Sequence, residues 1–477
     1  MENAARKSNL SRLLPLRIAA VLAIAVNFFW FTAGIFGSHF APDEMMNMGW
    51  AWEAGIAKIL ANLAQFYTTF YRPTGALYYW TLHRLFGLNP VPYRVIDLAV
   101  LAFHVWLAYR LASVLSRSRP VAWLAAFLFS YHEKIMIWVA YNGAWVYDRL
   151  CFTFSISALL VYVRARSRGG EISLRRGAAI LVLYVLALGS KEMAVAVPVL
   201  LIAYECVYAF RTWRQNRNAW LLITLLCVMT ALYAYGKTHG PDSLINNPQY
   251  RPVLNAATYL RSQARHMQDY FFLNHAFSPA IAAFILLAMA AAAFAFRSRP
   301  LIYAIAFLIF SPLPIAFINR SGGSLYIPLF GWCLFAAQAL AEISALSAGF
   351  CRMPRVRAPL FACLAAALSV FVLRSNVYYQ SFAKQPMLHN GDVTWRMIED
   401  LNRIHPKISP NGKVLIERNP FEGYNMVFIT QLWANVKPID VWIAGKNVAP
   451  DIVPPGTSVV LTLDSTGHLV QVPPPPQ

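Results

Sequence analysis

Long apolar stretches alternate with short basic segments along most of the chain. Five connecting segments are strongly basic, namely "SRSRP" at Ser116, "RARSRGGEISLRR" at Arg164, "RTWRQNR" at Arg211, "RSRP" at Arg297 and "CRMPRVR" at Cys351. The apolar stretches lie near residues 17–37, 93–113, 120–140, 146–163, 177–190, 192–210, 219–236, 278–296, 300–318, 325–346 and 358–374. Cytoplasmic loops are enriched in Lys and Arg, so the pattern predicts a polytopic α-helical membrane protein. We expect about eleven transmembrane helices, with the N-terminus inside.

The composition agrees with a membrane protein. The chain has 477 residues, of which 58% are hydrophobic and only 13% are charged, more apolar than the core of a soluble protein requires. A net charge of +20 can indicate a nucleic-acid partner. Here the basic residues form short clusters between apolar stretches, so we expect contacts with membrane lipids and none with nucleic acid. The first apolar stretch is long for a signal sequence, and we interpret it as an uncleaved helix.

The first outer loop, from about residue 37 to residue 92, contains two predicted helices. "APDEMMNMGWAWEAGIAKILANLAQF" has apolar residues at helical spacing, and its proline followed by two acids is typical of a helix start. "RPTGALYYWTLHRLFG" predicts a second amphipathic helix. Both are rich in Trp, Tyr and Arg near their ends, which favours a position in the membrane interface.

The end of the chain has a different pattern. We divide the chain into a transmembrane part, residues 1–374, and a small extracytoplasmic α/β domain, residues 375–477. "KVLIERNP", "DVWIAG" and "TSVVLTLDSTGHLVQV" predict strands, with "DSTG" as a hairpin turn. "DVTWRMIEDLNRI" and "YNMVFITQLWANV" predict helices. The final "PPPP" is expected to be extended.

Charged residues and histidine recur at the outer ends of the predicted helices, whereas the inner loops are basic with Glu171 as their acid. The outer residues are Asp43, Glu44, Arg72, His132, Glu133, Lys134, Asp148, Arg149, Lys191, Glu192 and Arg320. Taken singly, each is as compatible with a structural role, as an interfacial anchor or a helix cap, as with a functional one. Their collection on one side predicts a polar cavity that opens outward and contains both acids and cations.

Such a cavity is suited to glycosyl transfer from a lipid phosphate. A carboxylate can accept the proton of an attacking hydroxyl, and Lys and Arg can stabilise a phosphate leaving group. A donor carried on a lipid would reach the cavity from the bilayer. No glycine-rich nucleotide-binding motif is apparent, so a nucleotide sugar is not required.

Several of these segments resemble those of one enzyme family. The acid pair after the first apolar stretch, "YRPTGALYYW", "YHEKIMIWVAYN", "LGSKEMAVAVPVLLIAYE" and "SGGSLYIPLFGW" together resemble the GT-C superfamily of polyprenyl-phosphate-sugar glycosyltransferases. Within it, the protein O-mannosyltransferase-like branch is the most similar. The resemblance implies a multi-pass protein, here of a bacterial inner membrane, whose active site faces outward. It also implies a polyprenyl-phosphate sugar as the donor and an extracytoplasmic protein, lipid or glycan as the acceptor.

The resemblance also implies individual roles. Asp43 would be the catalytic base, and Glu44 would support it or bind the acceptor. Arg72, Lys191 and Glu192 match the family's "RP" and "KE" segments, the latter lining the donor site.

Other positions match the family in part. Tyr326 lies in a segment like the family's "YLYLP", and His132 matches the family's histidine in the second outer loop. The sequence departs from the family at Lys134, where an acid is usual. "SGGS" stands where a basic residue usually precedes the tyrosine motif, with Arg320 further upstream.

Three other functions remain open. A transporter or lipid flippase would favour polar residues at mid-membrane and broken helices. A polymerase or ligase of envelope polysaccharides would use a late outer loop, and Arg251, Arg261, Arg265 and His266 lie in such a loop. A non-catalytic assembly factor would use the tail for docking.

No cofactor is required by any motif. Asp43, Glu44 and His132 could bind a divalent metal ion, although no ligand spacing demands one.

Overall fold

The chain is described by a computed structural model. It describes residues 2–65, 72–167, 169–212, 216–239, 243, 246–248, 250–318, 320–450 and 452–474. The end of the predicted extended proline segment, residues 475–477, lies outside the described residues. Most of the chain is helical, and strands occur only after residue 411 in the part of the chain described.

The long helices, in chain order, are α1 (Glu2–Thr32), α2 (Pro42–Ala64), α3 (Pro73–Phe86), α4 (Pro90–Ser116), α5 (Arg119–Ser130), α6 (Glu133–Tyr141), α7 (Val146–Ser167), α8 (Leu174–Leu188), α9 (Ala196–Tyr208), α10 (Arg217–Thr238), α11 (Ala256–Tyr270), α12 (Pro279–Ala295), α13 (Arg299–Phe310), α15 (Tyr326–Phe350), α16 (Arg357–Ile404) and α17 (Asn425–Ala434). Short helical turns precede several of them: η1 (Ala33–Gly37), η2 (Gly143–Trp145), η3 (Glu192–Val195), α14 (Leu313–Ala316), η6 (Gly322–Leu325) and η7 (Pro354–Val356).

Six helical segments among the described residues are long and apolar enough to cross a membrane. They span residues 17–37, 90–116, 143–167, 217–238, 322–350 and 354–404. Shorter apolar helices occupy 119–130, 279–295 and 299–310. The prediction of a multi-pass membrane protein is therefore supported, whereas the count of eleven transmembrane helices is not confirmed. The predicted stretch near 120–140 is divided between α5 and α6, and the stretches at 177–190 and 192–210 contain the shorter helices α8 and α9.

The described part of the predicted first outer loop contains two helices, α2 and α3, as the sequence predicts. Pro42 occupies the first turn of α2 with Asp43 and Glu44 beside it, and Pro73 begins α3. Proline suits these positions because the first N–H groups of a helix have no partner within the helix. Gly55 has φ +70°, a left-handed value that favours glycine, and it kinks α2.

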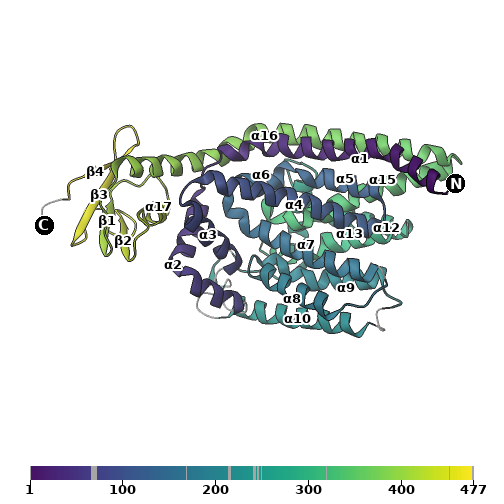
Figure 1. Ribbon diagram of the computed structural model, residues 1–477, viewed down its shortest axis with the longest axis horizontal. Coiled ribbons are helices and arrows are strands. Elements are labelled where there is room, and N and C mark those ends of the chain that lie inside the picture. The colour runs from purple at the N-terminus through teal and green to yellow at the C-terminus, as the bar shows by residue number, and fades with distance from the viewer. Residues whose placement is uncertain are drawn as a thin grey trace.

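The helix α16 runs without a break from the last apolar stretch into the C-terminal segment. It lies beside α1 in Figure 1, and the Gln380 side chain donates a hydrogen bond to the Phe31 carbonyl at 3.2 Å. The division of the chain near residue 375 therefore does not coincide with any break in helical structure, and it stays a prediction.

The C-terminal segment contains a four-stranded sheet in the order β2-β1-β3-β4. Its strands are β1 (Gly412–Ile416), β2 (Ile439–Ile443), β3 (Thr457–Leu463) and β4 (Leu469–Val472). β3 and β4 fall within the predicted segments, whereas β1 and β2 each begin one residue earlier than predicted. β1 is parallel to both β2 and β3, while β3 and β4 form an antiparallel hairpin. The predicted "DSTG" turn closes this hairpin, with the Gly467 N–H donating to the Asp464 carbonyl at 3.2 Å.

The sheet shares one hydrophobic core with α2 and α3, which lie at the same end of the helical body (Figure 1). Met48 and Trp52 of α2 belong to the same buried cluster as Ile416 of β1. Trp52 also donates a hydrogen bond from its indole N–H to Asn435 at 2.9 Å, and the Lys437 ammonium lies 4.0 Å from its ring centre. Burial of this shared apolar surface fixes the C-terminal segment against the start of α2.

Candidate active site

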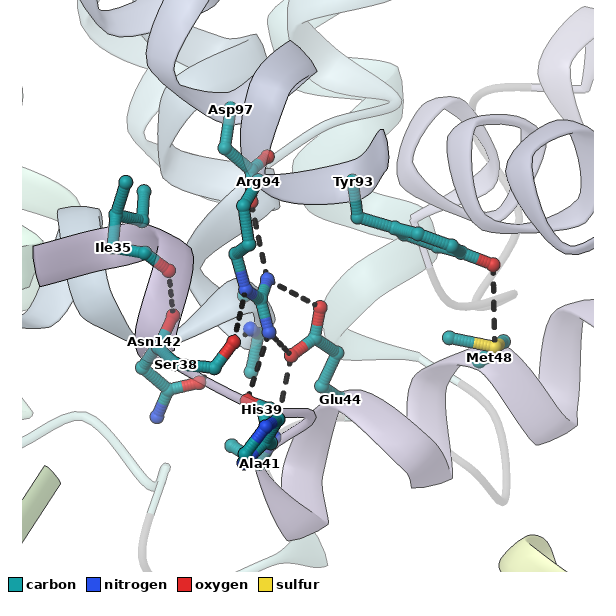
Figure 2. Close-up of polar contacts among 12 residues, drawn as sticks. Ile35, Ser38, His39, Ala41, Glu44, Met48, Tyr93, Arg94, Asp97 and Asn142 are labelled. Carbon is teal, nitrogen blue, oxygen red and sulfur yellow. Dashed lines mark hydrogen bonds and ion pairs between the residues drawn. The ribbon is translucent and has the colours of Figure 1, made fainter. Parts of the chain in front are cut away.

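The acid pair at the start of α2 has one buried member. Glu44 is 1% exposed and forms a bidentate ion pair with Arg94 of α4, with Nη1–Oε1 and Nη2–Oε2 distances of 3.0 and 2.8 Å (Figure 2). Arg94 also donates to the carbonyls of Ser38 and His39, at 3.0 and 2.9 Å. The planar guanidinium suits this bidentate geometry. The contacts fix the segment that leads into α2 against α4.

The ion pair continues into a buried chain of alternating charges. Asp97, one turn after Arg94, accepts from it at 3.2 Å and pairs with Arg149 of α7 at 2.8 Å. The Tyr78 hydroxyl of α3 donates to the same carboxylate at 2.7 Å. With Glu44, two carboxylates therefore face two guanidinium groups, and the four side chains come from the three helices α2, α4 and α7. Buried charges are tolerated when each has a partner of this kind.

Gly143 of η2 packs directly on this chain of charges. A Cβ atom at Gly143 would lie 1.9 Å from Glu44 Oε1, so any larger residue would force the Glu44 carboxylate to move away from this position. Its carbonyl accepts from the Tyr79 hydroxyl at 2.9 Å and from Arg149 at 3.3 Å. The η2 turn is thereby held against the start of α2.

Asp43 differs from Glu44 in its burial and in its contacts. It is exposed at the first turn of α2 and makes no hydrogen bond or ion pair with any residue that the structure describes. Both roles expected for Glu44 stay predictions, and its burial favours support of Asp43.

A second charged cluster lies where α3 meets the corner between α8 and η3. Arg72 pairs with Glu192 at 3.1 Å, and Lys191 pairs with Asp148 at 2.5 Å. The four side chains interact electrostatically with one another, and Lys237 interacts with Glu192. These five side chains carry three positive and two negative charges. The cluster therefore has excess positive charge, which favours an anion.

Backbone contacts position Arg72 in this cluster. The Thr74 N–H donates to the Gly189 carbonyl and its hydroxyl to the Leu186 carbonyl, both at 3.0 Å. The start of α3 is thus bound to the end of α8. An aromatic ring packs beside this cation: the ring centre of Tyr147 lies 5.0 Å from Cζ of the Arg72 guanidinium.

The Lys191 ammonium has a similar aromatic neighbour. It lies 4.7 Å from the ring centre of Trp145, which belongs to η2. The η2 turn therefore contacts Glu44 through Gly143 and Lys191 through Trp145. It links the start of α2 to the charged cluster.

His132, Glu133 and Lys134 belong to a third group, packed on the end of α11 and on α16. His132 stacks on Phe272 with ring centres 4.1 Å apart, and Glu133 accepts from the Tyr131 hydroxyl at 2.6 Å. Lys134 donates to the carbonyl of Leu273. These contacts have no residue in common with the pairs around Lys191, so the predicted single cavity is divided into separate groups. Their role in substrate binding stays a prediction.

The described part of the predicted late outer loop contains α11, which contacts the segment around Arg320. His266 donates to the Arg320 carbonyl at 3.1 Å, and Asp269 accepts from the Gly322 N–H at 2.9 Å. Burial lowers the pKa of His266 to about 4 and raises the pKa of Asp269. The Arg320 side chain is exposed and lies 4.9 Å from the Tyr250 ring centre.

Tyr326 lies deeper than the other predicted site residues. It is 1% exposed, and its hydroxyl is 2.9 Å from Nδ1 of His104. Its ring stacks on Phe129 with ring centres 5.3 Å apart. These contacts place Tyr326 in the core between α4, α5 and α15.

Two residues of the buried chain of charges, Arg94 and Asp97, were missed from the sequence. Both lie within or next to the apolar stretch 93–113, and their three-residue spacing puts them on one face of α4. Ionisable residues inside an apolar stretch are costly and mark functional or paired positions. That signal was available in "PYRVIDLAV".

The possibility of a metal site finds no support in the described part of the chain. There, no group of three or more His, Cys, Asp or Glu side chains is placed to hold a metal ion. Glu44 is already engaged by Arg94, and His132 lies against α11, so the three residues considered from the sequence are not brought together.

Comparison with known proteins gives a match in fold. No protein-family model matches the chain, and no curated protein matches its sequence. The structure is similar to ArnT from Cupriavidus metallidurans bound to undecaprenyl phosphate, with a TM-score of 0.55 and 15% identity over 94% of this chain and 93% of ArnT. The apo state of ArnT gives a TM-score of 0.53 and 14% identity over 95% and 94%.

A weaker similarity is found to AglB, an oligosaccharyltransferase from Archaeoglobus fulgidus in complex with an inhibitory peptide and a dolichol-phosphate. Its TM-score is 0.48, with 11% identity over 96% of this chain and 74% of AglB. The similarity to ArnT extends over almost the whole of both chains. The fold expected from the resemblance to GT-C glycosyltransferases is therefore confirmed, whereas the mannosyltransferase-like branch is not.

Proposed function

We propose that the protein is a membrane glycosyltransferase that transfers a sugar from a polyprenyl-phosphate donor to an extracytoplasmic acceptor. Its fold is that of ArnT, which was solved bound to undecaprenyl phosphate. The observation that carries the proposal is the arrangement around η2. This turn contacts the acid pair on one side and the Arg72–Lys191 cluster on the other.

Asp43 acts as the general base in this proposal. An acceptor hydroxyl loses its proton to the Asp43 carboxylate as its oxygen bonds to the anomeric carbon of the sugar. The bond between that carbon and the phosphate oxygen breaks, and the phosphate leaves with the electron pair. A carboxylate that is exposed and has no described partner is available for this step, whereas a salt-bridged one is not.

The Arg72–Lys191 cluster stabilises the leaving phosphate. Negative charge on the phosphate grows as the glycosidic bond breaks, and nearby cations lower the energy of that state. The cations are held in place by Glu192 and Asp148, so little reorganisation is needed when the donor binds. The lipid chain of the donor remains in the bilayer, and the product polyprenyl phosphate leaves along the membrane.

Glu44 has a positioning role. Its bidentate pair with Arg94 fixes the first turn of α2, so that Asp43 is presented at a defined place relative to η2. We also propose that this end of the molecule, with the C-terminal segment, faces the outside of a bacterial inner membrane.

The proposal is tested by binding of undecaprenyl phosphate, which requires no knowledge of the sugar or acceptor. Native mass spectrometry of the purified protein measures its affinity against that of a zwitterionic phospholipid. Lys191→Met should weaken binding roughly 10-fold, the effect of one lost charge-assisted hydrogen bond. Arg84→Met removes an exposed cation at the end of α3 and is the matched control. Equal affinity of wild type and Lys191→Met would contradict the phosphate assignment.

A further inference from the structure

A solvent-facing cleft lies away from both charged clusters, between the turn that joins α3 to α4 and the ends of α16 and α17. Its volume is about 620 Å³, within the range of sites that bind small molecules. Its lining includes two tryptophans, Trp395 of α16 and Trp433 of α17, and three asparagines, Asn89, Asn402 and Asn435. The proposed transfer reaction uses none of these residues.

The three asparagines have the same hydrogen-bonding arrangement. In each, the side-chain oxygen accepts from the protein: Asn89 from the Val91 N–H at 3.1 Å, Asn402 from Trp433 at 2.7 Å and Asn435 from Trp52 at 2.9 Å. An oxygen that is held in this way fixes the orientation of its amide. The three NH₂ groups have no hydrogen-bond partner among the described residues, and they offer donors to a ligand in one cleft.

The aromatic residues are also held in place. Trp395 stacks on His39 with ring centres 5.1 Å apart, and the Trp433 indole N–H is fixed by Asn402. Both indoles are partly buried and line the cleft with apolar surface beside the amide groups. Rigid aromatic surface next to oriented donors suits a ligand with apolar faces and polar edges.

The lining carries no formal charge at neutral pH. Its single titratable group is His83, and burial lowers the pKa of that imidazole, so the ring is neutral. A phosphate or carboxylate ligand would require Arg or Lys, which the lining lacks. A lipid chain would require apolar residues throughout. A peptide strand would require a strand edge, and both edge strands, β2 and β4, lie outside the lining.

We propose that this cleft binds a neutral saccharide. The hydroxyl oxygens of a sugar accept from the amides of Asn89, Asn402 and Asn435. The C–H faces of the sugar pack on Trp395 and Trp433. Binding of this kind needs no sugar transfer, so the inference goes beyond the proposed function and can fail or hold independently of it.

The test is direct binding to the full-length protein in lipid nanodiscs, which avoid detergents with sugar headgroups. The probes are neutral hexasaccharides: cellohexaose, laminarihexaose, maltohexaose, mannohexaose, xylohexaose and N-acetylchitohexaose. Saturation-transfer NMR at millimolar saccharide should show binding of at least one of them. Binding of none of the probes would overturn the proposal.

Isosteric variants assign the binding to the cleft. Asn402→Asp and Asn435→Asp keep the acceptor oxygens for the tryptophan N–H groups but replace the donors, so each should weaken binding roughly 10-fold without lowering Tm. Trp395→Ala should abolish binding. Trp50→Ala, which removes a 42% exposed indole on α2 outside the lining, should leave it unchanged. Wild-type affinity in both aspartate variants, or displacement of the saccharide by a fatty acid, would contradict the assignment.

Discussion

Replacing Glu44 with Gln should destabilise the fold, whereas replacing its neighbour Asp43 with Asn should not. Glu44 gives both of its oxygens to Arg94, and both partners are 1% exposed. In Glu44→Gln, one oxygen becomes an NH₂ group that faces a guanidinium N–H. A buried positive charge then loses its closest counter-charge, and a donor opposes a donor.

The size of the loss in unfolding free energy depends on the contacts that Arg94 retains in Glu44→Gln. Removing one partner of a buried ion pair costs about 3–5 kcal/mol. Arg94 retains Asp97 at 3.2 Å and the two backbone carbonyls of Ser38 and His39. We therefore expect the lower end, about 3 kcal/mol, and a decrease in Tm on the order of 5 °C.

The assay is thermal unfolding of the purified protein, followed by intrinsic tryptophan fluorescence. Asp43→Asn is the matched control because it removes the same charge one residue away, at an exposed position with no described partner. Its effect should be within about 0.5 kcal/mol of wild type. If the two variants melt at the same temperature, Glu44 does not hold the start of α2.

Three further changes test other parts of the structure. Gly143→Ala places a Cβ where Glu44 lies, so it should lower Tm by as much as Glu44→Gln; an unchanged Tm would refute the contact. Trp52→Ala removes the indole that binds Asn435, and it should speed proteolysis between α16 and β1 without changing the helical content; unchanged cleavage would show that the C-terminal segment is held elsewhere. The pKa of His266 is about 4 in the folded chain and about 6.5 when unfolded, so only the unfolded state gains a proton between these values. Stability should therefore fall as pH decreases from about 6.5 to about 4, and this slope should be shallower in His266→Gln.

The local elements could be predicted because their signals are local. Proline followed by acids marks the start of α2, and a short stretch rich in Val, Leu and Thr marks β3. The hairpin turn at Asp464 and the helix α17 follow from similar patterns. These signals depend on neighbours a few residues away in sequence.

The different environments of Asp43 and Glu44 could not be predicted from their own segment. The difference depends on Arg94, 50 residues later, and on the absence of a side chain at Gly143. The packing of the C-terminal segment on Trp52 depends on contacts across almost the whole chain. The count of eleven transmembrane helices stays a prediction, because apolar stretches of similar composition fold into helices of different length, six of them long enough by themselves to cross a membrane in the described part of the chain.

We propose that Asp43 is the base in sugar transfer from a polyprenyl phosphate. The direct measurement is the amount of polyprenyl-phosphate-linked sugar in lipid extracts of source cells, determined by mass spectrometry. Cells without the protein should accumulate the donor, and the wild-type chain should remove it. Asp43→Asn should leave it accumulated at unchanged protein level and Tm, since loss of a general base slows a reaction roughly 10²–10⁴-fold. Clearance of the donor by Asp43→Asn as fast as by wild type would contradict the account.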